Sequence, residues 1–126
     1  MRILVVDDHD VVTRGVAAIL SSRKDIEVCD HAFDGKQGVE MARELNPDLI
    51  IMDITMPVLD GFGAAKQIRS FLPKVPILFL SMHNGAQLVH QAKAVGAQGF
   101  VRKDHASATL LQAVDLLSKN QTFFPY

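Results

Sequence analysis

Residues 48–57 read DLIIMDITMP, and this stretch decides the fold. Its apolar run, Leu49–Met52, offers no polar residue to face water, which is typical of a parallel strand covered on both faces. We expect a strand at Asp48–Met52, with the carboxylate of Asp53 just beyond its end. The stretch therefore predicts a buried strand of an α/β domain that carries one acidic side chain to the edge of the sheet.

The same pattern recurs on both sides of this stretch. Short apolar runs predict five strands: Arg2–Val6, Glu27–Ala32, Asp48–Met52, Pro76–Ser81 and Ala97–Arg102. The longer segments between and after them carry apolar residues at helical spacing. Five helices are marked in this way, by Val12, Val16, Ile19 and Leu20, by Val39, Met41, Ala42 and Leu45 before Pro47, by Ala65, Ile68 and Phe71 before Pro73, by Leu88, Ala92 and Val95 before Gly96, and by Leu110, Val114 and Leu117. Alternating βα units with right-handed crossovers predict a doubly wound parallel sheet with helices on both faces.

Size and composition limit the function. A chain of 126 residues matches one ordinary domain. With 13 Lys and Arg against 14 Asp and Glu, it has no basic field of the kind that binds nucleic acid. Its apolar runs are far shorter than the ~20 residues of a membrane span. The single cysteine, Cys29, has no partner for an internal disulfide and is expected to be a buried structural thiol. We expect a soluble, cytoplasmic protein with no membrane contact.

Polar and charged side chains follow the expected strand ends. They are Asp7, Asp8, Asp53, Ser81 and Lys103. In open α/β sheets, ligands bind beyond the carboxyl ends of the strands, where the winding reverses. Of the two common strand orders, 3-2-1-4-5 puts the first and third strands two spacings apart, roughly 9–10 Å, which is too far for Asp8 and Asp53 to share a metal ion. We therefore predict the flavodoxin-like order 2-1-3-4-5.

These residue types suit phosphoryl transfer. Neighbouring carboxylates repel one another unless a hard cation lies between them, and Mg²⁺ prefers oxygen ligands. A transferring phosphoryl group needs its oxygens neutralised and held, which the ammonium of Lys103 and the hydroxyl of Ser81 can do. Asp53, at the end of the central strand, is the expected nucleophile. Asp7 and Asp8 are then expected to hold the metal.

The same residues resemble the pattern of receiver domains of two-component response regulators, and the resemblance spans essentially the whole chain. It rests on Asp7-Asp8, Asp53 before Met56-Pro57, Asp60-Gly61, Ser81, and Phe100 ahead of Lys103. The resemblance implies that Asp53 is the phosphoacceptor and that Lys103 and Ser81 bind phosphoryl oxygens. It implies Mg²⁺ ligation by Asp8, Asp53 and the Thr55 carbonyl, with Asp7 acting through water. Thr55 and His83 would flank the acyl phosphate and tune its hydrolysis.

The resemblance also implies partners. A histidine kinase or phosphotransfer protein, or a small donor such as acetyl phosphate, would supply the phosphoryl group. Ser81 and Phe100 would then shift and change the surface of the fourth helix and fifth strand. The resemblance implies that the domain would catalyse only its own phosphorylation and dephosphorylation, so it is not expected to be an enzyme in the usual sense.

The opening residues 7–15, Lys103-Asp104 and residues 121–126 further resemble the NarL/FixJ branch, which usually adds a C-terminal helix-turn-helix domain. Residues 1–126 are then a receiver domain, with about residues 120–126 a tail or the start of a linker to an output domain that is absent from this chain. DNA would be bound only through that output domain. The resemblance implies dimerisation as the output, commonly with the first and fifth helices taking part, while the oligomeric state and the dimer surface stay open at this point.

Two positions depart from the family pattern. Asp104 follows Lys103 where most receivers have a proline in a cis bond, and a cis bond without proline costs about 2.5–4 kcal/mol, so the geometry of that peptide stays open. Phe100 stands where tyrosine is more common. It has no phenolic hydroxyl to offer a partner, so a change in its packing is the only way in which it could transmit a signal.

Other residues have simpler structural explanations. Taken singly, Asp60 is better explained as a helix cap. Phe123, Phe124 and Tyr126 are expected to be a terminal anchor or a frayed tail, and the histidines show no metal-binding spacing.

Other functions fit the residues less well. A haloacid-dehalogenase-type phosphatase needs a second carboxylate two residues beyond its nucleophile, where this chain has Thr55. The phosphate of a flavin mononucleotide carrier would be repelled by Asp7 and Asp8. A P-loop enzyme needs a GxxxxGK motif, which the sequence lacks. The remaining alternative is a degenerate or stand-alone receiver that works as a protein-interaction module without phosphorylation.

Overall fold

The structure is a computed structural model that describes residues 1–83 and 85–125. Its parallel sheet is formed by β1 (Arg2–Val6), β2 (Glu27–Ala32), β3 (Leu49–Asp53), β4 (Ile77–Ser81) and β5 (Gly99–Arg102). The strands lie in the order β2-β1-β3-β4-β5. The predicted order 2-1-3-4-5, which followed from the need to bring Asp8 near Asp53, is therefore confirmed.

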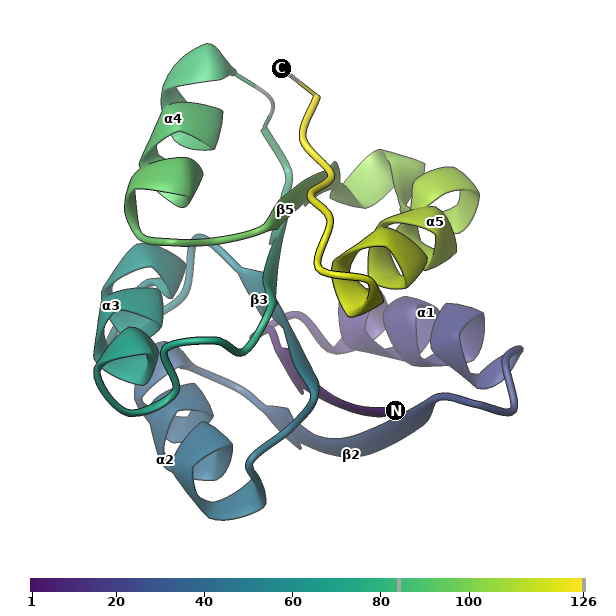
Figure 1. Ribbon diagram of the computed structural model, residues 1–126, viewed down its shortest axis with the longest axis horizontal. Coiled ribbons are helices and arrows are strands. Elements are labelled where there is room, and N and C mark those ends of the chain that lie inside the picture. Colours follow the sequence, from purple (N-terminus) through teal and green to yellow (C-terminus); the bar gives the residue numbers. More distant parts are fainter. Residues whose placement is uncertain (84, 126) are drawn as a thin grey trace.

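In the described part of the chain, five helices cover the sheet in two layers. They are α1 (Asp10–Ser21), α2 (Gly35–Leu45), α3 (Gly61–Phe71), α4 (Ala86–Ala94) and α5 (Ala106–Ser118), with a short 3-10 turn, η1 (Lys103–His105), before the last. α1 and α5 lie on one face, and α2, α3 and α4 lie on the other (Figure 1). Among the described helices none is long and apolar enough to cross a membrane.

The core is split by the sheet into two apolar clusters. Every residue of β3 is buried, and its side chains alternate between the clusters: Leu49 and Ile51 contact the α1/α5 side, while Ile50 and Met52 contact the α2/α3/α4 side. This two-sided burial explains why the run at 49–52 is apolar throughout, as the sequence predicted.

The predicted strands differ slightly from the observed ones. β1 and β2 match, but β3 lies one residue later than predicted, so Asp53 is the last residue of the strand and not the first residue of the loop. β4 begins at Ile77 and not at Pro76. β5 begins at Gly99, two residues later than predicted, because Ala97 still bonds its N–H to the Ala92 carbonyl at the end of α4.

Local details settle three smaller expectations. Asp60 caps α3 by accepting a hydrogen bond from the Gly63 N–H at 2.8 Å, so its predicted capping role is confirmed. No peptide bond between described residues is cis, so the bond from Lys103 to Asp104 is trans. Cys29 is half-buried and not fully buried as predicted, because β2 is an edge strand; burial nevertheless raises the pKa of its thiol.

Candidate functional site

The predicted site residues meet at the carboxyl edge of the sheet. Asp7 directly follows β1 and is fully buried, Asp53 ends β3 with 3% exposure, and Ser81 ends β4 with 4% exposure. Lys103 directly follows β5. Parallel pairing sets β3 beside β4 and β4 beside β5, with Asp53 opposite Leu80 and Ser81 opposite Arg102. The fold therefore brings together side chains from the carboxyl ends of four separate strands.

The ammonium of Lys103 is held between two buried carboxylates. Its Nζ lies 3.1 Å from Asp7 Oδ2 and 3.2 Å from Asp53 Oδ2. The side chains of all three residues are at most 4% exposed. Water screens such buried charges poorly, so this ammonium is the main positive charge facing Asp53.

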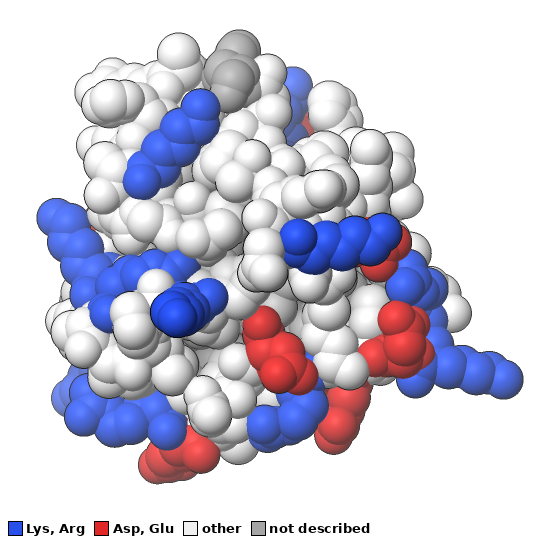
Figure 2. All heavy atoms as spheres, in the orientation of Figure 1, with Lys and Arg blue, Asp and Glu red and all other residues white. Residues whose placement is uncertain are grey.

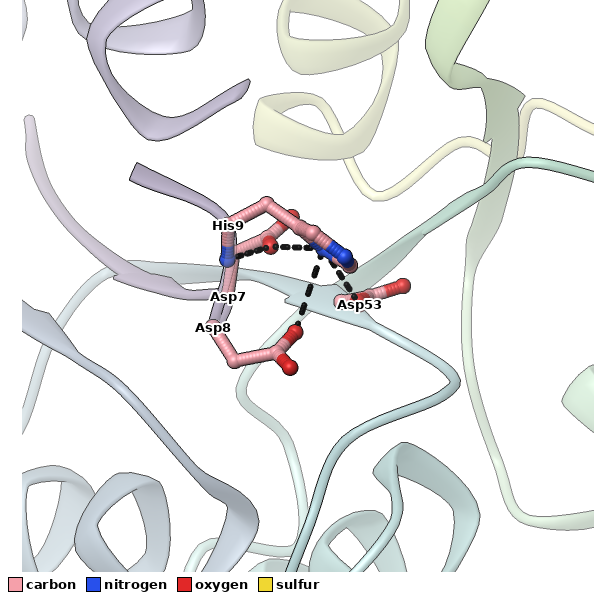
Figure 3. A group of neighbouring side chains, drawn as sticks. All are labelled: Asp7, Asp8, His9 and Asp53. Carbon is pink, nitrogen blue, oxygen red and sulfur yellow. Dashed lines mark hydrogen bonds and ion pairs between the residues drawn. The ribbon is translucent and has the colours of Figure 1, made fainter. Parts of the chain in front are cut away.

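His9 is a site residue that the sequence interpretation missed. Its Nδ1 lies 3.2 Å from Asp7 Oδ1, 3.2 Å from Asp8 Oδ1 and 3.7 Å from Asp53 Oδ2 (Figure 3). Its backbone N–H also donates to Asp7 Oδ1 at 2.8 Å. His9 belongs to no paired-histidine motif. The one feature of the sequence that points to it is its position directly after Asp7-Asp8.

The site carries more negative charge than its cation neutralises. Burial and the nearby negative charge of Asp7 raise the pKa of Asp53 above its ordinary value, and Lys103 only partly opposes this shift. Asp7 Oδ2 and Asp53 Oδ2 are both buried without a hydrogen bond from any described residue, although Lys103 lies within ion-pair distance of each. Two buried oxygens of this kind favour an additional cation.

The donor atoms present fit a hard divalent cation. One side-chain atom each from Asp7, Asp8, His9 and Asp53 lies within 4.8 Å of all the others. Three of these four residues offer carboxylate oxygens, the ligands that Mg²⁺ prefers. With the two buried oxygens still lacking a hydrogen bond, the residues present fit the predicted metal.

A cleft of about 150 Å³ opens onto these residues. Its wall brings together all the remaining residues predicted for phosphoryl binding and tuning; the lining residues are His9, Asp53, Thr55, Ser81, Met82, His83 and Lys103. Ser81 Oγ accepts a hydrogen bond from the His83 N–H at 3.0 Å, which leaves its own hydroxyl proton available to a ligand. Phe100 does not line this cleft; it is 1% exposed and packs into the core beside it.

Two further contacts fix the acidic loops. His31 Nε2 lies 3.0 Å from the Asp7 carbonyl oxygen and 2.9 Å from Thr13 Oγ1, which ties the end of β2 to the loop after β1. At the other loop, the Gly61 N–H donates to the Ile54 carbonyl at 2.7 Å. A Cβ on Gly61 would overlap the Asp53 carbonyl oxygen, so glycine is needed where α3 approaches the end of β3.

Comparison with known proteins assigns the family. The family model described as "Response regulator receiver domain" matches residues 3–115. Among curated relatives, the transcriptional regulatory protein LnrK of Bacillus subtilis is 38% identical over 90% of this chain and 52% of its own length. The response regulator protein VraR of Staphylococcus aureus is 34% identical over 98% of this chain and 59% of its own length. The chain thus spans between about half and three-fifths of these relatives.

Solved structures agree with this assignment. The crystal structure of a LuxR-family two-component response regulator from Aurantimonas has a TM-score of 0.93 to this chain and 32% identity, over 97% of this chain and 87% of that one. The fold, the gathered acidic, basic and hydroxyl side chains and these similarities lead to one conclusion: the chain belongs to the family of response regulator receiver domains, among relatives that regulate transcription in two-component systems.

Proposed function

We propose that Asp53 accepts a phosphoryl group in a Mg²⁺-dependent reaction and that the domain works as a switch. The observation that carries this proposal is the placement of Asp53: its buried Oδ2 lacks a hydrogen bond from any described residue, faces Lys103 Nζ at 3.2 Å, and opens onto a cleft of about 150 Å³. A carboxylate so placed has a free lone pair for attack and a cation beside it to receive the negative charge of the product.

The metal would be held by the Asp8 and Asp53 carboxylates and the Thr55 carbonyl, with Asp7 contacting it through water. When bound, Mg²⁺ would neutralise phosphoryl oxygens and hold them in position. The proposal draws support from the raised pKa of Asp53, because that shift reports unbalanced negative charge that a cation would relieve.

The side chains of this domain then carry the transfer. An oxygen of Asp53 attacks the phosphorus of a phosphohistidine; the new O–P bond forms as the N–P bond breaks, and the departing imidazole keeps its electron pair and takes up a proton. The ammonium of Lys103 neutralises a phosphoryl oxygen in flight, and the Ser81 hydroxyl donates a hydrogen bond to another. Water reaching the same phosphorus reverses the modification, with Thr55 and His83 on the wall of the cleft controlling its access.

The switch follows from the change in charge and size at Asp53. The phosphoryl group draws Ser81 toward it, and Phe100 moves into the space beside Ser81, which changes the surface of α4 and β5. The phosphodonor would be a histidine kinase or a phosphotransfer protein, and small donors such as acetyl phosphate would act more slowly. The domain would have no catalytic activity beyond its own phosphorylation and dephosphorylation.

The output we propose is control of transcription in the cytoplasm. LnrK is named as a transcriptional regulatory protein, and this chain covers 52% of its length. We therefore place a C-terminal DNA-binding domain beyond this chain, with about residues 120–126 as the tail of the receiver or the start of the linker. Dimerisation through α1 and α5 would bring two such domains together, and DNA would be contacted only by them.

One experiment tests the phosphoacceptor directly. The chain is incubated with acetyl phosphate and Mg²⁺, and its intact mass is measured beside that of Asp53→Asn. We expect one phosphoryl mass increment in the parent chain, none in the variant, and none in either chain when the metal is chelated. Equal labelling of both chains would place the acceptor elsewhere, and no labelling of either would favour the stand-alone interaction module.

A further inference from the structure

After α5 the chain turns back and runs along the edge of β5 (Figure 1). We call residues 121–125 the strap. Asn120, with a φ of 61°, makes the turn, and Phe123 then pairs with Gly99 in a parallel bridge. Two main-chain hydrogen bonds fix this pairing: the Phe123 N–H donates to the Gln98 carbonyl at 3.0 Å, and the Phe100 N–H donates to the Phe123 carbonyl at 2.9 Å. The strap therefore occupies the free edge of the sheet as an added strand.

The two phenylalanines of the strap enter different parts of the core. Phe123 packs against the apolar cluster on the α1/α5 side, and Phe124 packs against the cluster on the α2/α3/α4 side, which contains Phe100. Lys93 Nζ of α4 lies 4.9 Å from the centre of the Phe124 ring, a cation–π contact. Most of the surface over the strap in Figure 2 is uncharged. The edge of β5 thus forms a slot between α4 and α5 that suits an extended segment with two adjacent aromatic side chains.

The packing between the strap and the core is incomplete. A cavity of about 180 Å³ lies against it, with walls formed by Phe100, Val101, Arg102, His105, Thr109, Phe123, Phe124 and Pro125. Gln121, Thr122 and Pro125 are exposed. Segments with few main-chain hydrogen bonds and incomplete packing open at the low end of the free energies of local unfolding.

The strand under the strap leads directly to the phosphorylation site. Phe100, whose N–H bonds the strap, stands three residues before Lys103, whose ammonium contacts Asp53. In the neighbouring strand, Phe79 pairs with Phe100 and Ser81 pairs with Arg102. A displacement of Ser81 or Lys103 toward a phosphoryl group therefore acts on the strand that the strap pairs with.

We infer that the edge of β5 is a docking slot for an extended aromatic segment, that residues 121–125 fill it in cis, and that phosphorylation of Asp53 lowers this occupancy. The coupling rests on the proposed function. A phosphoryl group that draws Ser81 inward gives the Phe100 ring space on the Ser81 side, and the movement of this ring rearranges the cluster against which Phe124 packs. Phe124 then loses packing, and the strap detaches from the edge of β5.

Thermodynamic reciprocity gives the coupling a second consequence. If phosphorylation weakens strap docking, then weakening the strap must favour the phosphorylated state by the same factor. Phe124→Ala removes the packing on the Phe100 side, whereas Thr122→Ala alters an exposed residue of the same strap and is the matched control. We expect Phe124→Ala to bind beryllofluoride, a phosphoryl mimic, about fivefold or more tightly than the parent chain, and Thr122→Ala to bind it equally.

The experiment follows amide hydrogen exchange by NMR in the full chain of 126 residues, with Mg²⁺, before and after beryllofluoride. We expect exchange at the Phe123 amide to rise at least about tenfold, while the Ile50 amide, in fully buried β3, stays protected. Before beryllofluoride, Phe124→Ala should already exchange faster at Phe123 than Thr122→Ala. Protection of Phe123 that depends on protein concentration would contradict docking in cis.

The possible failures can be told apart, because fluorine NMR reports bound beryllofluoride in the same sample. Bound beryllofluoride with unchanged exchange at Phe123 overturns the coupling and leaves the proposed function standing. Failure to bind beryllofluoride overturns the proposed function and the coupling together. A Phe123 amide that stays equally protected in Phe124→Ala and Thr122→Ala overturns the docking slot, whatever the state of Asp53.

Discussion

Lys103 Nζ stands 3.2 Å from Asp53 Oδ2, and neither side chain is more than 4% exposed. The Asp7 carboxylate is buried beside this pair, with its Oδ2 at 3.1 Å from the same ammonium, so one cation neutralises two carboxylates. Removing the cation from such a cluster leaves buried charge without compensation, and breaking a buried pair in this way costs about 3–5 kcal/mol.

We therefore expect Lys103→Met to lower the free energy of unfolding by about 3 kcal/mol at neutral pH without added metal. The measurement is urea unfolding followed by circular dichroism. The control is Lys119→Met, which changes an exposed lysine just after α5 and should leave stability within about 0.5 kcal/mol. Equal stability of the two variants would mean that the Lys103 contacts contribute little.

Asp53 gives a pH prediction with a definite sign. Its pKa is raised in the folded state, so the folded chain binds more protons than the unfolded chain between the unfolded pKa of about 3.9 and the raised value. The free energy of unfolding therefore falls as pH rises through that window. Asp53→Asn removes this dependence, so its stability relative to the parent chain should increase as the pH is raised from about 4, without metal. A constant difference between the two chains across the titration would contradict the assignment.

Metal binding should appear as stabilisation. Mg²⁺ at a hundredfold excess over its dissociation constant adds about 2.7 kcal/mol to the free energy of unfolding. We expect the melting temperature of the parent chain to rise with added Mg²⁺, to return when the metal is chelated, and to change little with Mg²⁺ in Asp8→Asn. Asp10→Asn, which alters an exposed acid paired with Arg14 outside the site, is the control and should respond like the parent.

Alanine substitutions at Gly61 and Gly15 form a test and its matched control. A Cβ at Gly61 would overlap the Asp53 carbonyl oxygen, whereas a Cβ at Gly15, within α1, would have no heavy atom within 4 Å. Gly61→Ala should lower the free energy of unfolding by about 1–3 kcal/mol, as overpacking does, and weaken Mg²⁺ binding by moving the end of β3. Gly15→Ala should raise stability by about 0.5–1 kcal/mol. Thermal melts of both variants, with and without Mg²⁺, give the comparison.

Thr55 and His83 should control the lifetime of the acyl phosphate. Both line the cleft at Asp53, so trimming either to alanine admits water more freely, and we expect dephosphorylation to become several-fold faster. Mg²⁺ affinity should stay nearly unchanged. The readout is decay of the phosphorylated mass after the donor is removed, with Val58→Ala, an exposed loop residue that does not line the cleft, as the control. Unchanged decay in both variants would remove the tuning role.

Much of the fold could be predicted from the sequence, because hydrophobic periodicity and the polar residues at strand ends are local patterns. The apolar run at 49–52 predicted a strand buried on both faces, and the need to bring Asp8 near Asp53 selected the strand order, which the structure confirms. The positions of Asp7, Asp53 and Lys103 at the predicted strand ends indicated that they would meet, and they do so within ion-pair distances.

What the sequence could not supply depended on rotamers and on long-range packing. The approach of His9 Nδ1 to three carboxylates depends on how its ring turns, and no spacing rule reports that. The β-bridge between Phe123 and Gly99 depends on a chain reversal after α5, which is made at Asn120, a residue in the left-handed conformation. Of the three aromatic residues expected to anchor or fray at the end, Phe123 and Phe124 are anchored, and Tyr126 lies outside the described residues.

The pairing of Phe123 with Gly99 also bears on how the protein avoids self-association. The outer strands of the sheet are β2 and β5. β2 carries the charged residues Glu27 and Asp30, whereas β5, with the sequence GFVR, has a charge only at its last residue and is covered by the strap. Unpaired N–H and C=O groups on an apolar edge strand are a template for intermolecular β-sheet growth. Shortening the chain to residue 120 should therefore cost solubility, and a lysine introduced on the bare edge should restore it.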